Sequence, residues 1–508
     1  MKKLFLVLAC VSLFLVLNSQ DLETDINFGN NGIVKVVTPN SYSVGYKVVP
    51  LNDGSYISAN LIENVTTGES GFSLVKLLSD GNIDSSFGMN GHFNIVTDHT
   101  EYPADFVILP DKKIAIAISD NDGKIELNII NENGSQFKKF NLSPFPNNYL
   151  IPIRILFRDN HLYIGGIYNS QNLDLELMFV IKIDLDGNFD KTFAENGVFM
   201  SEKIIELNAK FRDMAFQNDD IIIFSSGNSD DLSDYLFMFR INQNGGGDLS
   251  FSEGGILFIK NEASENFGTI KTDMSGSIYM TLFDYPEILK INSDGFPDPG
   301  YGIKGHAIDN YYLDNLKNSF FSILMKDNSA LIFGTALKGS SDQYDAPAIA
   351  KYDKEGKRDI AFGNKGIFSF PADFNATFIN GCIDNDNNLV AIGNCEGTSG
   401  NLNSQTFLTR YNIKTATTTD DILTEQILLY PNPVDTDHFY INYANKKTIT
   451  SSYSIFDNLG RKVMTGPLNN KLSDYYKIDL PDNLRNGLYF LSLQSDPNSK
   501  MIKFVVKH

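Results

Sequence analysis

A short pattern of acids, glycines and one aromatic residue recurs at intervals of about 50–60 residues along most of this chain. Clear copies run over Asp80–Gly91, Asp186–Gly197 and Glu355–Gly366, and weaker copies contain Phe251 and Tyr301. A period of this length is typical of a solenoid or a propeller, in which each repeat supplies one supersecondary unit. The repeat therefore excludes most folds that are built around a single core.

Two further features recur with the same period and indicate the number of repeats. An apolar strand with one long polar side chain precedes the pattern in each repeat, and these side chains are Lys76, Asn128, Lys182, Arg240, Lys290, Lys351 and Arg410. Polar turns separate these strands at Asp53-Gly54, Asp111-Lys112, Asp159-Asn160, Asp219-Asp220, Ser275-Gly276, Asp327-Asn328 and Asp386-Asn387. Apolar runs such as Ile221–Phe224 suit strands that are packed on both faces, so we predict an all-β body of about seven four-stranded repeats over residues 21–415.

The body begins with only part of a repeat. A half-copy of the pattern at Phe28–Gly32 is followed by a predicted strand over Ile33–Val37. In a ring, this strand can complete the last sheet beside Phe407–Asn412, which protects the sheet edges. An open solenoid would need polar capping repeats, and we find none at either end. The prediction is a closed seven-bladed β-propeller, with the solenoid as the alternative.

The pattern Asp-Gly-x-x-Asp-x-x-Phe-Gly-x-x-Gly resembles the delta-60 repeat family over about residues 25–415. The resemblance implies a repeat propeller and no particular activity. The glycines and the aromatic residue suit tight turns and close packing, so we interpret them as structural.

Two sets of repeat residues could also bind ligands. Asp184, Asp186, Asn188 and Asp190 are spaced as in a calcium loop, but Gly187 departs from the EF-hand pattern and sister repeats lose the acids. We therefore predict no cofactor, with calcium as the alternative. The six cations of the repeated strand position could line a ring that attracts anions, or they could lie along the sheets with solvated heads.

No catalytic, cofactor-binding or metal-binding residues are predicted. The six histidines, none of which has a partner at metal-ligand spacing, are His92, His99, His161, His306, His438 and His508. No nucleophile elbow, zinc-binding helix or phosphate loop occurs. Acids are abundant, so a carboxylate pair for glycoside cleavage stays an alternative. Cys382 and Cys395 flank a predicted hairpin that places Cys395 opposite a residue near 377, which predicts two free thiols.

Residues 1–20 have the composition of a signal peptide. Lys2 and Lys3 precede an apolar run over Leu4–Leu17, which is shorter than the ~20 residues of a membrane span. We predict cleavage near Ser19 or Gln20; an uncleaved anchor and lipoprotein processing at Cys10 are the alternatives.

A polar linker over residues 416–426 precedes a stretch of different character. Alternating strands are expected at Ile427–Tyr430, Phe439–Tyr443, Ser452–Asp457, Tyr489–Leu493 and Met501–Val506, which predicts a small β-sandwich over residues 427–508. The motif residues of this stretch are Tyr430, Pro431, Asn432, Pro433, Gly460, Arg461, Gly487, Tyr489, Lys503 and Lys507. In this order, at the chain's end, they resemble the type A sorting domain of the type IX secretion system of Bacteroidota. The resemblance implies a translocon and a surface protease as partners, and a cargo that is released or attached to the surface; an ordinary terminal β-domain is the alternative.

These features together predict a protein that passes through the periplasm and is secreted or displayed on the cell surface. A formal charge of −20 argues against nucleic acid and anionic lipid as partners. The polar connections that could bind a glycan or a protein are Ile62–Gly71, Ser226–Tyr235, Lys338–Ala346 and Asn394–Gln405. We predict a binding module; the alternatives are an enzyme that acts on extracellular polysaccharide through acids in the propeller channel, and a structural spacer.

Overall fold

The computed structural model divides the chain into two compact units, residues 1–414 and residues 415–508. The residues that it describes are 22–97, 105–145, 149–170, 175–203, 209–229, 232–260, 268–282, 287–307, 316–325, 327–336, 346–363, 366–370, 375–396, 404–413, 428–430, 434, 437–442, 452–458, 460–467, 471–472, 475–481, 484–493 and 501–507. The predicted signal peptide and linker lie outside these ranges. In the described part of the chain, no helix is long and apolar enough to cross a membrane.

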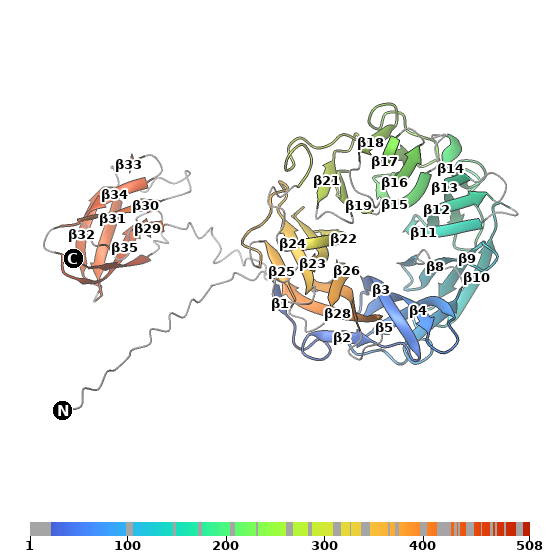
Figure 1. The fold of residues 1–508 in the computed structure, drawn as a ribbon, viewed down its shortest axis with the longest axis horizontal. Helices are drawn as coiled ribbons and strands as arrows, with labels where there is room; N and C mark the ends of the chain where they lie inside the picture. Colours follow the sequence, from blue (N-terminus) through green and yellow to red (C-terminus); the bar gives the residue numbers. More distant parts are fainter. Residues whose placement is uncertain are drawn as a thin grey trace. The chain divides into compact units, whose positions relative to one another are not determined.

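The described residues of the first unit form seven antiparallel sheets. Figure 1 shows them arranged in a ring, with the first strand of each sheet toward the centre, as in a β-propeller. Their strands, sheet by sheet, are β3 (Ser41–Pro50), β4 (Tyr56–Asn64), β5 (Ser70–Leu77) and β6 (His92–Val96); β7 (Asp105–Ile108), β8 (Ile114–Ser119), β9 (Ile125–Ile130) and β10 (Gln136–Leu142); β11 (Tyr149–Arg158), β12 (His161–Ser170), β13 (Leu175–Asp184) and β14 (Val198–Met200); β15 (Ala209–Gln217), β16 (Asp220–Ser229), β17 (Leu232–Ile241) and β18 (Ile256–Lys260); β19 (Gly268–Thr272), β20 (Ile278–Leu282) and β21 (Ile288–Ile291); β22 (Leu316–Leu324), β23 (Ala330–Ala336), β24 (Ala346–Tyr352) and β25 (Ile367–Ser369); and β26 (Ala376–Ile383), β27 (Asn388–Glu396), β28 (Ser404–Ile413), β1 (Leu22–Thr24) and β2 (Ile33–Val36). One short 3-10 helix, η1, covers Ser201–Lys203.

Local sequence explains these elements. Each predicted polar turn lies between the first and second strands of a sheet. Between β11 and β12 the turn residues Asp159 and Asn160 both have positive φ, 49° and 59°, which aspartate and asparagine tolerate better than most residues. Second strands such as β8 are buried along their whole length because sheets pack against both of their faces. The core therefore lies between neighbouring sheets.

The N-terminal strands complete the last sheet. Strand β2 pairs with β28, with Ile33 opposite Thr409 and Val36 opposite Thr406. Strand β1 pairs with the same strand further along, with Leu22 opposite Ile413. This is the pairing that the sequence predicted for Ile33–Val37, except that the strand ends at Val36.

The cysteine hairpin follows the predicted register with one small difference. Ile383 lies opposite Leu389, as expected, but Cys395 lies opposite Ala376 because a bulge between Phe378 and Asn380 shifts the pairing. Cys382 and Cys395 are both free thiols, and burial raises the pKa of each.

The second unit contains two four-stranded sheets in its described part. Their strands are β29 (Leu428–Tyr430), β30 (His438–Asn442), β34 (Tyr475–Asp479) and β33 (Lys471–Leu472); and β32 (Lys462–Pro467), β31 (Ser452–Asp457), β35 (Gly487–Leu493) and β36 (Met501–Val506). Buried side chains from both sheets, among them Phe439, Ile455 and Phe504, form one core. The sequence prediction missed β32, β33 and β34.

Candidate functional site

The repeated cations form ion pairs with acids of the repeat pattern. Each cation contacts the aspartate eight positions later in its own repeat, and the pairs are Lys76 with Asp84 (3.5 Å), Lys182 with Asp190 (2.7 Å), Arg240 with Asp248 (2.6 Å), Lys290 with Asp298 (2.9 Å) and Lys351 with Asp359 (3.1 Å). In all five, the aspartate N–H also donates to the carbonyl of the cationic residue at 2.9 Å. We call these contacts the repeat ion pairs. Because each cation is neutralised locally, they do not form the anion-attracting ring considered from the sequence.

The aromatic residue of the pattern lies under the cation. The Arg240 guanidinium is 5.2 Å from the ring centre of Phe251, and the Lys290 ammonium is 5.6 Å from that of Tyr301. Both rings are buried. A cation above an aromatic face is a stabilising contact, so cation, acid and ring form one structural unit.

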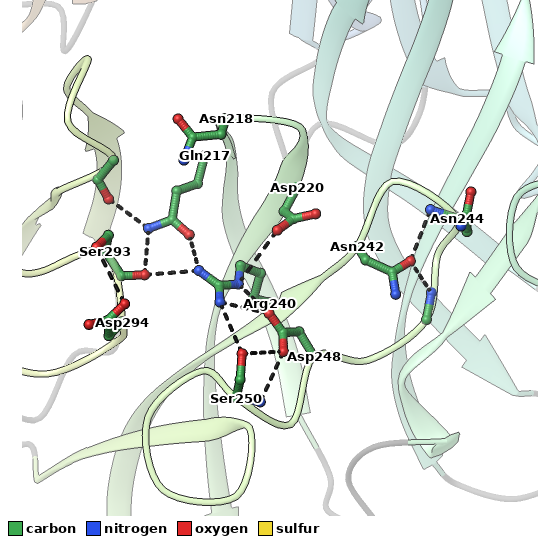
Figure 2. Close-up of polar contacts among 12 residues, drawn as sticks. Gln217, Asn218, Asp220, Arg240, Asn242, Asn244, Asp248, Ser250, Ser293 and Asp294 are labelled. Carbon is green, nitrogen blue, oxygen red and sulfur yellow. Dashed lines mark hydrogen bonds and ion pairs between the residues drawn. The ribbon is translucent and has the colours of Figure 1, made fainter.

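The Arg240 ion pair also connects neighbouring sheets, as Figure 2 shows. Arg240 Nη1 donates to Gln217 Oε1 at 2.7 Å and to the Ser293 carbonyl of the next sheet at 2.9 Å. Gln217 Nε2 in turn donates to the Gly276 carbonyl at 2.6 Å. The repeat ion pair therefore contributes to the joint between two sheets.

The copy that closes the ring is assembled from the two ends of the unit. Arg410 Nη2 lies 2.6 Å from Asp25 Oδ2, and the Asp25 N–H donates to the Arg410 carbonyl at 2.9 Å. Arg410 Nη1 donates to the Ser79 carbonyl of the neighbouring sheet at 2.5 Å, as Arg240 does to Ser293. Asp25 and Phe28 are therefore the acid and ring of the sixth repeat ion pair.

The second repeat departs from the pattern. Asn128 donates to Glu126 at 2.8 Å where the other repeats have a cation and an aspartate. Phe140 nevertheless occupies the aromatic place, since a Cβ added to Gly187 would lie 2.8 Å from its ring. Phe140 is therefore the aromatic residue of the second repeat.

The residues considered for calcium make turn contacts. Asp184 Oδ1 accepts the N–H groups of Asp186 and Asn188, each at 2.9 Å. Asp190 pairs with Lys182, and Asp186 pairs with Lys138. Among the described residues, no group of three acids, histidines or cysteines is placed to hold a metal ion.

The two histidines that share a repeat position have different surroundings. His92 is buried, which lowers its pKa, and its Nδ1 has no hydrogen-bond partner in the described structure. His306 contacts Glu287, and that hydrogen bond raises the pKa of His306. The position is therefore not a repeated site.

A second charged set, which sequence reasoning missed, lies on the inner strands of the ring. Lys47 Nζ is 2.5 Å from Asp105 Oδ1, and Arg154 Nε is 2.5 Å from Asp213 Oδ1. Arg154 Nη1 also reaches Asp105 Oδ2 at 3.4 Å, so the four residues form one chain of alternating charge. Lys271, on the next inner strand β19, interacts electrostatically with all four of these residues. We call these five residues the channel cluster.

Local backbone irregularity positions the channel cluster. Strands β3, β11 and β15 each carry a bulge just before Lys47, Arg154 and Asp213, respectively. A bulge re-aims the side chain that follows it. The sequence held a weak signal, because these residues and Asp105 are charged positions that lie five or six residues before the polar turn of their sheet.

The carboxylates of the channel cluster are tightly held. Asp105 Oδ2 accepts the Ile155 N–H at 3.0 Å, and Asp213 Oδ2 accepts the Ile270 N–H at 2.9 Å. Burial favours the neutral form of Asp105, but attraction to Lys47 and Arg154 outweighs it and lowers the pKa of this carboxyl. Asp105 is therefore ionised at neutral pH and poorly suited to act as a general acid.

One of the four polar connections lines a cleft. The connection Ile62–Gly71 is described throughout, and Asn64 and Glu69 from it line a cavity of about 340 Å³ together with Met89, Asn94 and Val96 of the same sheet's outer part. Met89 is 80% exposed and Val96 is 63% exposed. We call this cavity the β6 cleft. The other three connections fall partly outside the described residues.

The motif residues of the second unit lie at a turn and on two neighbouring strands. Gly460, with φ of 76°, and Arg461 form the turn between β31 and β32, where Arg461 Nε donates to Asp457 Oδ2 at 2.7 Å. Gly487 begins β35, and buried Tyr489 donates its hydroxyl to the Arg485 carbonyl at 2.8 Å.

The remaining motif residues lie at the ends of the unit's sequence. Lys503 lies exposed on β36, and the Lys507 N–H donates to the Val434 carbonyl at 2.8 Å. Tyr430 ends β29, while Pro431, Asn432 and Pro433 lie outside the described residues.

Comparison with protein families matches residues 428–507 to the family described as the secretion system C-terminal sorting domain. Those residues are a type IX sorting domain. The sorting domain directs export, so the protein is secreted or located at the cell surface.

Solved structures resemble the chain only distantly. A polysaccharide lyase, Uly1, matches with a TM-score of 0.42 and 10% identity over 76% of this chain and 93% of that one. An acylaminoacyl peptidase from Pyrococcus horikoshii matches with a TM-score of 0.41 and 11% identity over 80% of this chain, which spans only 59% of the peptidase. The β-propeller domain of the Trilobed protease from Pyrococcus furiosus gives 0.37 and 10% identity over 76% and 99%. The comparison with curated proteins gave no match, and none of these structures informs the activity of the chain.

Proposed function

We propose that the chain is an exported binding protein whose β-propeller recognises an extracellular glycan or protein at the β6 cleft. The observation that carries this proposal is the cleft itself, in which a polar connection faces exposed apolar side chains. Asn64, Asn94 and Glu69 offer hydrogen-bonding groups, while Met89 and Val96 offer apolar surface. Surfaces that combine the two are suited to ligands with both hydroxyl or amide groups and apolar faces.

The state of the channel acids favours binding over catalysis. Hydrolysis of a glycosidic bond by two carboxyl groups needs one whose pKa is raised, so that it can donate a proton. Asp105 has a lowered pKa and pairs with two cations. Asp213 is buried and pairs with Arg154. These contacts argue against the channel enzyme that the sequence left as an alternative.

The export route can be refined in the same proposal. An N-terminal signal peptide over residues 1–20 would carry the chain to the periplasm, and a type A sorting domain would present it to the type IX translocon and a surface protease. The repeats would belong to the delta-60 family and the source to Bacteroidota. The repeat pattern and the motif residues of the sorting domain support these statements.

Export is tested by deleting residues 428–507 in a host with a type IX system. The full chain should reach the surface or the medium, and mass spectrometry should show its sorting domain removed. The shortened chain should stay in the periplasm. Secretion of the shortened chain at the full-length level would contradict the proposed route.

Binding is tested with the mature chain on a glycan array and against defined surface proteins. Met89→Glu should abolish binding of the ligand found, because it places a charge in the cleft, and Asn94→Ala should weaken it about tenfold. Met274→Glu is the matched control, since Met274 is an exposed methionine outside the cleft. Equal binding by the Met89 and Met274 variants, or chemical change of the ligand, would overturn the proposal.

A further inference from the structure

The outermost strand of the first sheet lacks the features that protect the other outer strands of the ring. A sheet edge is commonly protected from further pairing when its strand is short or carries charged side chains. Strands β14 and β25 have three residues each. The other outer strands carry the charged residues Glu23, Lys35, Lys138, Lys139, Lys260 and Lys290. Strand β6 has five residues, His92–Val96, and contains no lysine, arginine, aspartate or glutamate, so it is the one outer strand of the described sheets without this protection.

The backbone of β6 offers hydrogen-bonding groups at its outer edge. Directly after the strand, the Thr97 N–H donates to the Ser70 carbonyl at 3.1 Å. Backbone pairing alternates along an antiparallel strand, so the N–H and C=O groups of Asn94 and Val96 point away from β5. No hydrogen bond from outside the sheet reaches these groups among the described residues. Such an edge can pair with an extended peptide, which then adds a strand to the sheet.

The charge of the adjoining β6 cleft favours a cationic partner. The side chains of Asn94 and Val96 line this cleft, so a strand added beside them has its alternate side chains next to it. Glu69 is the only charged residue among the described lining residues. Thr67 Oγ1 donates to Glu69 Oε2 at 2.9 Å, and no described cation pairs with this exposed carboxylate. His92, also in the lining, is neutral at pH 7 because burial lowers its pKa. The cleft therefore carries one negative charge that has no counter-charge.

We propose that β6 binds an extended peptide segment of a protein partner, which pairs with the backbone of Asn94 and Val96 and places a lysine or arginine side chain beside Glu69. A peptide repeats its N–H and C=O groups at the spacing of a strand edge, and a glycan does not. Met89 and Val96 offer exposed apolar surface to the neighbouring side chains of the segment. This inference rests on the function proposed for the β6 cleft and assigns the cleft to a protein partner.

The test is fluorescence anisotropy of labelled seven-residue peptides with the mature full chain. The probe alternates threonine and valine around one central lysine, and the control peptide has glutamate in place of this lysine. The lysine peptide should bind with Kd of about 100 µM at low salt. The glutamate peptide should bind at least about threefold more weakly, and added salt should reduce this difference.

Two variants assign the site. Val96→Pro removes an N–H that points away from β5, so it should weaken binding of the lysine peptide about tenfold. Val96→Ala keeps this N–H and is the matched control, with a loss of less than about threefold. Glu69→Lys should reverse the preference between the two peptides, a result that stays measurable if the proline variant folds poorly. Glu253→Lys, at an exposed glutamate outside the cleft, should keep the preference of the unmodified chain.

The outcomes separate this inference from the proposed function. No binding of the lysine peptide, or an unchanged preference in Glu69→Lys, would overturn the peptide site. If a glycan then binds and Met89→Glu abolishes that binding, the proposed function stands without the peptide site; if Met89→Glu affects no ligand, both fail. Self-association of the chain that Val96→Pro abolishes would identify a second copy as the occupant of the edge and would also contradict the inference.

Discussion

The repeat ion pairs and the channel cluster are built from the same side chains, lysine or arginine with aspartate, but they occupy the ring differently. A repeat ion pair joins two residues of one repeat, and the same backbone hydrogen bond accompanies it in each copy. The channel cluster joins different sheets through contacts that occur once, such as Arg154 with both Asp105 and Asp213. The first set is periodic, and the second breaks the period.

The periodic and the non-periodic contacts differ in where they occur in the ring. The repeat ion pair recurs in six places with its aromatic ring and its turn, and at Arg240 and Arg410 it also contacts the neighbouring sheet. The channel cluster occupies five inner strands and makes the ring asymmetric. The other two inner strands of the ring, β22 and β26, carry the uncharged residues Phe321 and Asn380 at the corresponding distance from the turn.

The largest expected effect follows from breaking the channel cluster. Asp213→Ala leaves Arg154 without its closest carboxylate and leaves the N–H groups of Met214 and Ile270 without their acceptor. Removing one member of a buried ion pair costs about 3–5 kcal/mol. Urea unfolding of the mature chain should show this loss. Asp186→Ala, at an exposed turn carboxylate, is the control and should lower the free energy of unfolding by less than about 1 kcal/mol. Similar losses of stability in both variants would show that the channel cluster does not stabilise the fold.

The next effect distinguishes the closing ion pair from those within one repeat. Arg410 contacts Asp25, Tyr56 and the Ser79 carbonyl, so it joins the two ends of the unit and the first sheet. We expect Arg410→Ala to lower the free energy of unfolding by about 2–3 kcal/mol and Lys351→Ala, in a more exposed pair, by about 1 kcal/mol. Chemical denaturation measures both, and equal losses would contradict a special role for closure.

Periodic features of the fold could be predicted from the sequence, while most contacts of the candidate sites could not. The seven turns and the strand after Phe28 follow from local signals, and Ile33 does lie opposite Thr409. The pairing of Lys182 with Asp190 was visible as a repeated spacing, but it needed the turn geometry to become a contact.

Lys47 and Arg154 illustrate the limit of sequence reasoning. Each is a cation in a largely apolar strand, and its partner comes from another repeat. The bulge that positions each cation is not indicated by any local residue type. In the sorting domain, the exposed strand β32 gave too weak an alternation to be predicted. The sheets themselves could therefore be predicted from the sequence, whereas the side-chain contacts between different sheets could not.

A smaller effect concerns pH. Hydrogen bonds with Lys182 and Thr192 lower the pKa of Asp190. A lowered folded-state pKa adds stability that is fully present above the unfolded value of about 4 and is lost as pH falls through the folded value. Asp190→Asn should therefore be about 1 kcal/mol less stable than the unmodified chain at pH 5, and the gap should close toward pH 2. Lys182→Met removes the same pair from the other side and should give the same profile; a gap that is constant with pH would contradict the ion pair.

The smallest effect uses a difference among the repeats themselves. The residue after the aromatic ring has positive φ in every copy except the second, where Asn141 follows Phe140 within β10. It is glycine at Gly29, Gly88, Gly302 and Gly363, but Ala194 in the third repeat, with φ of 43°, and Ser252 in the fourth, with φ of 52°. An alanine in this conformation destabilises the folded chain by about 1–2 kcal/mol. Replacing it with glycine removes this strain, but the greater conformational freedom of glycine in the unfolded chain offsets part of the gain. Ala194→Gly should therefore raise the free energy of unfolding by about 0.5 kcal/mol in urea. Ala117→Gly, in buried strand β8, is the matched control and should lower it by about 1 kcal/mol, because no positive φ is relieved there. If both substitutions destabilise the chain alike, the turn after the ring is not under backbone strain, and the repeat pattern does not select glycine for its conformation.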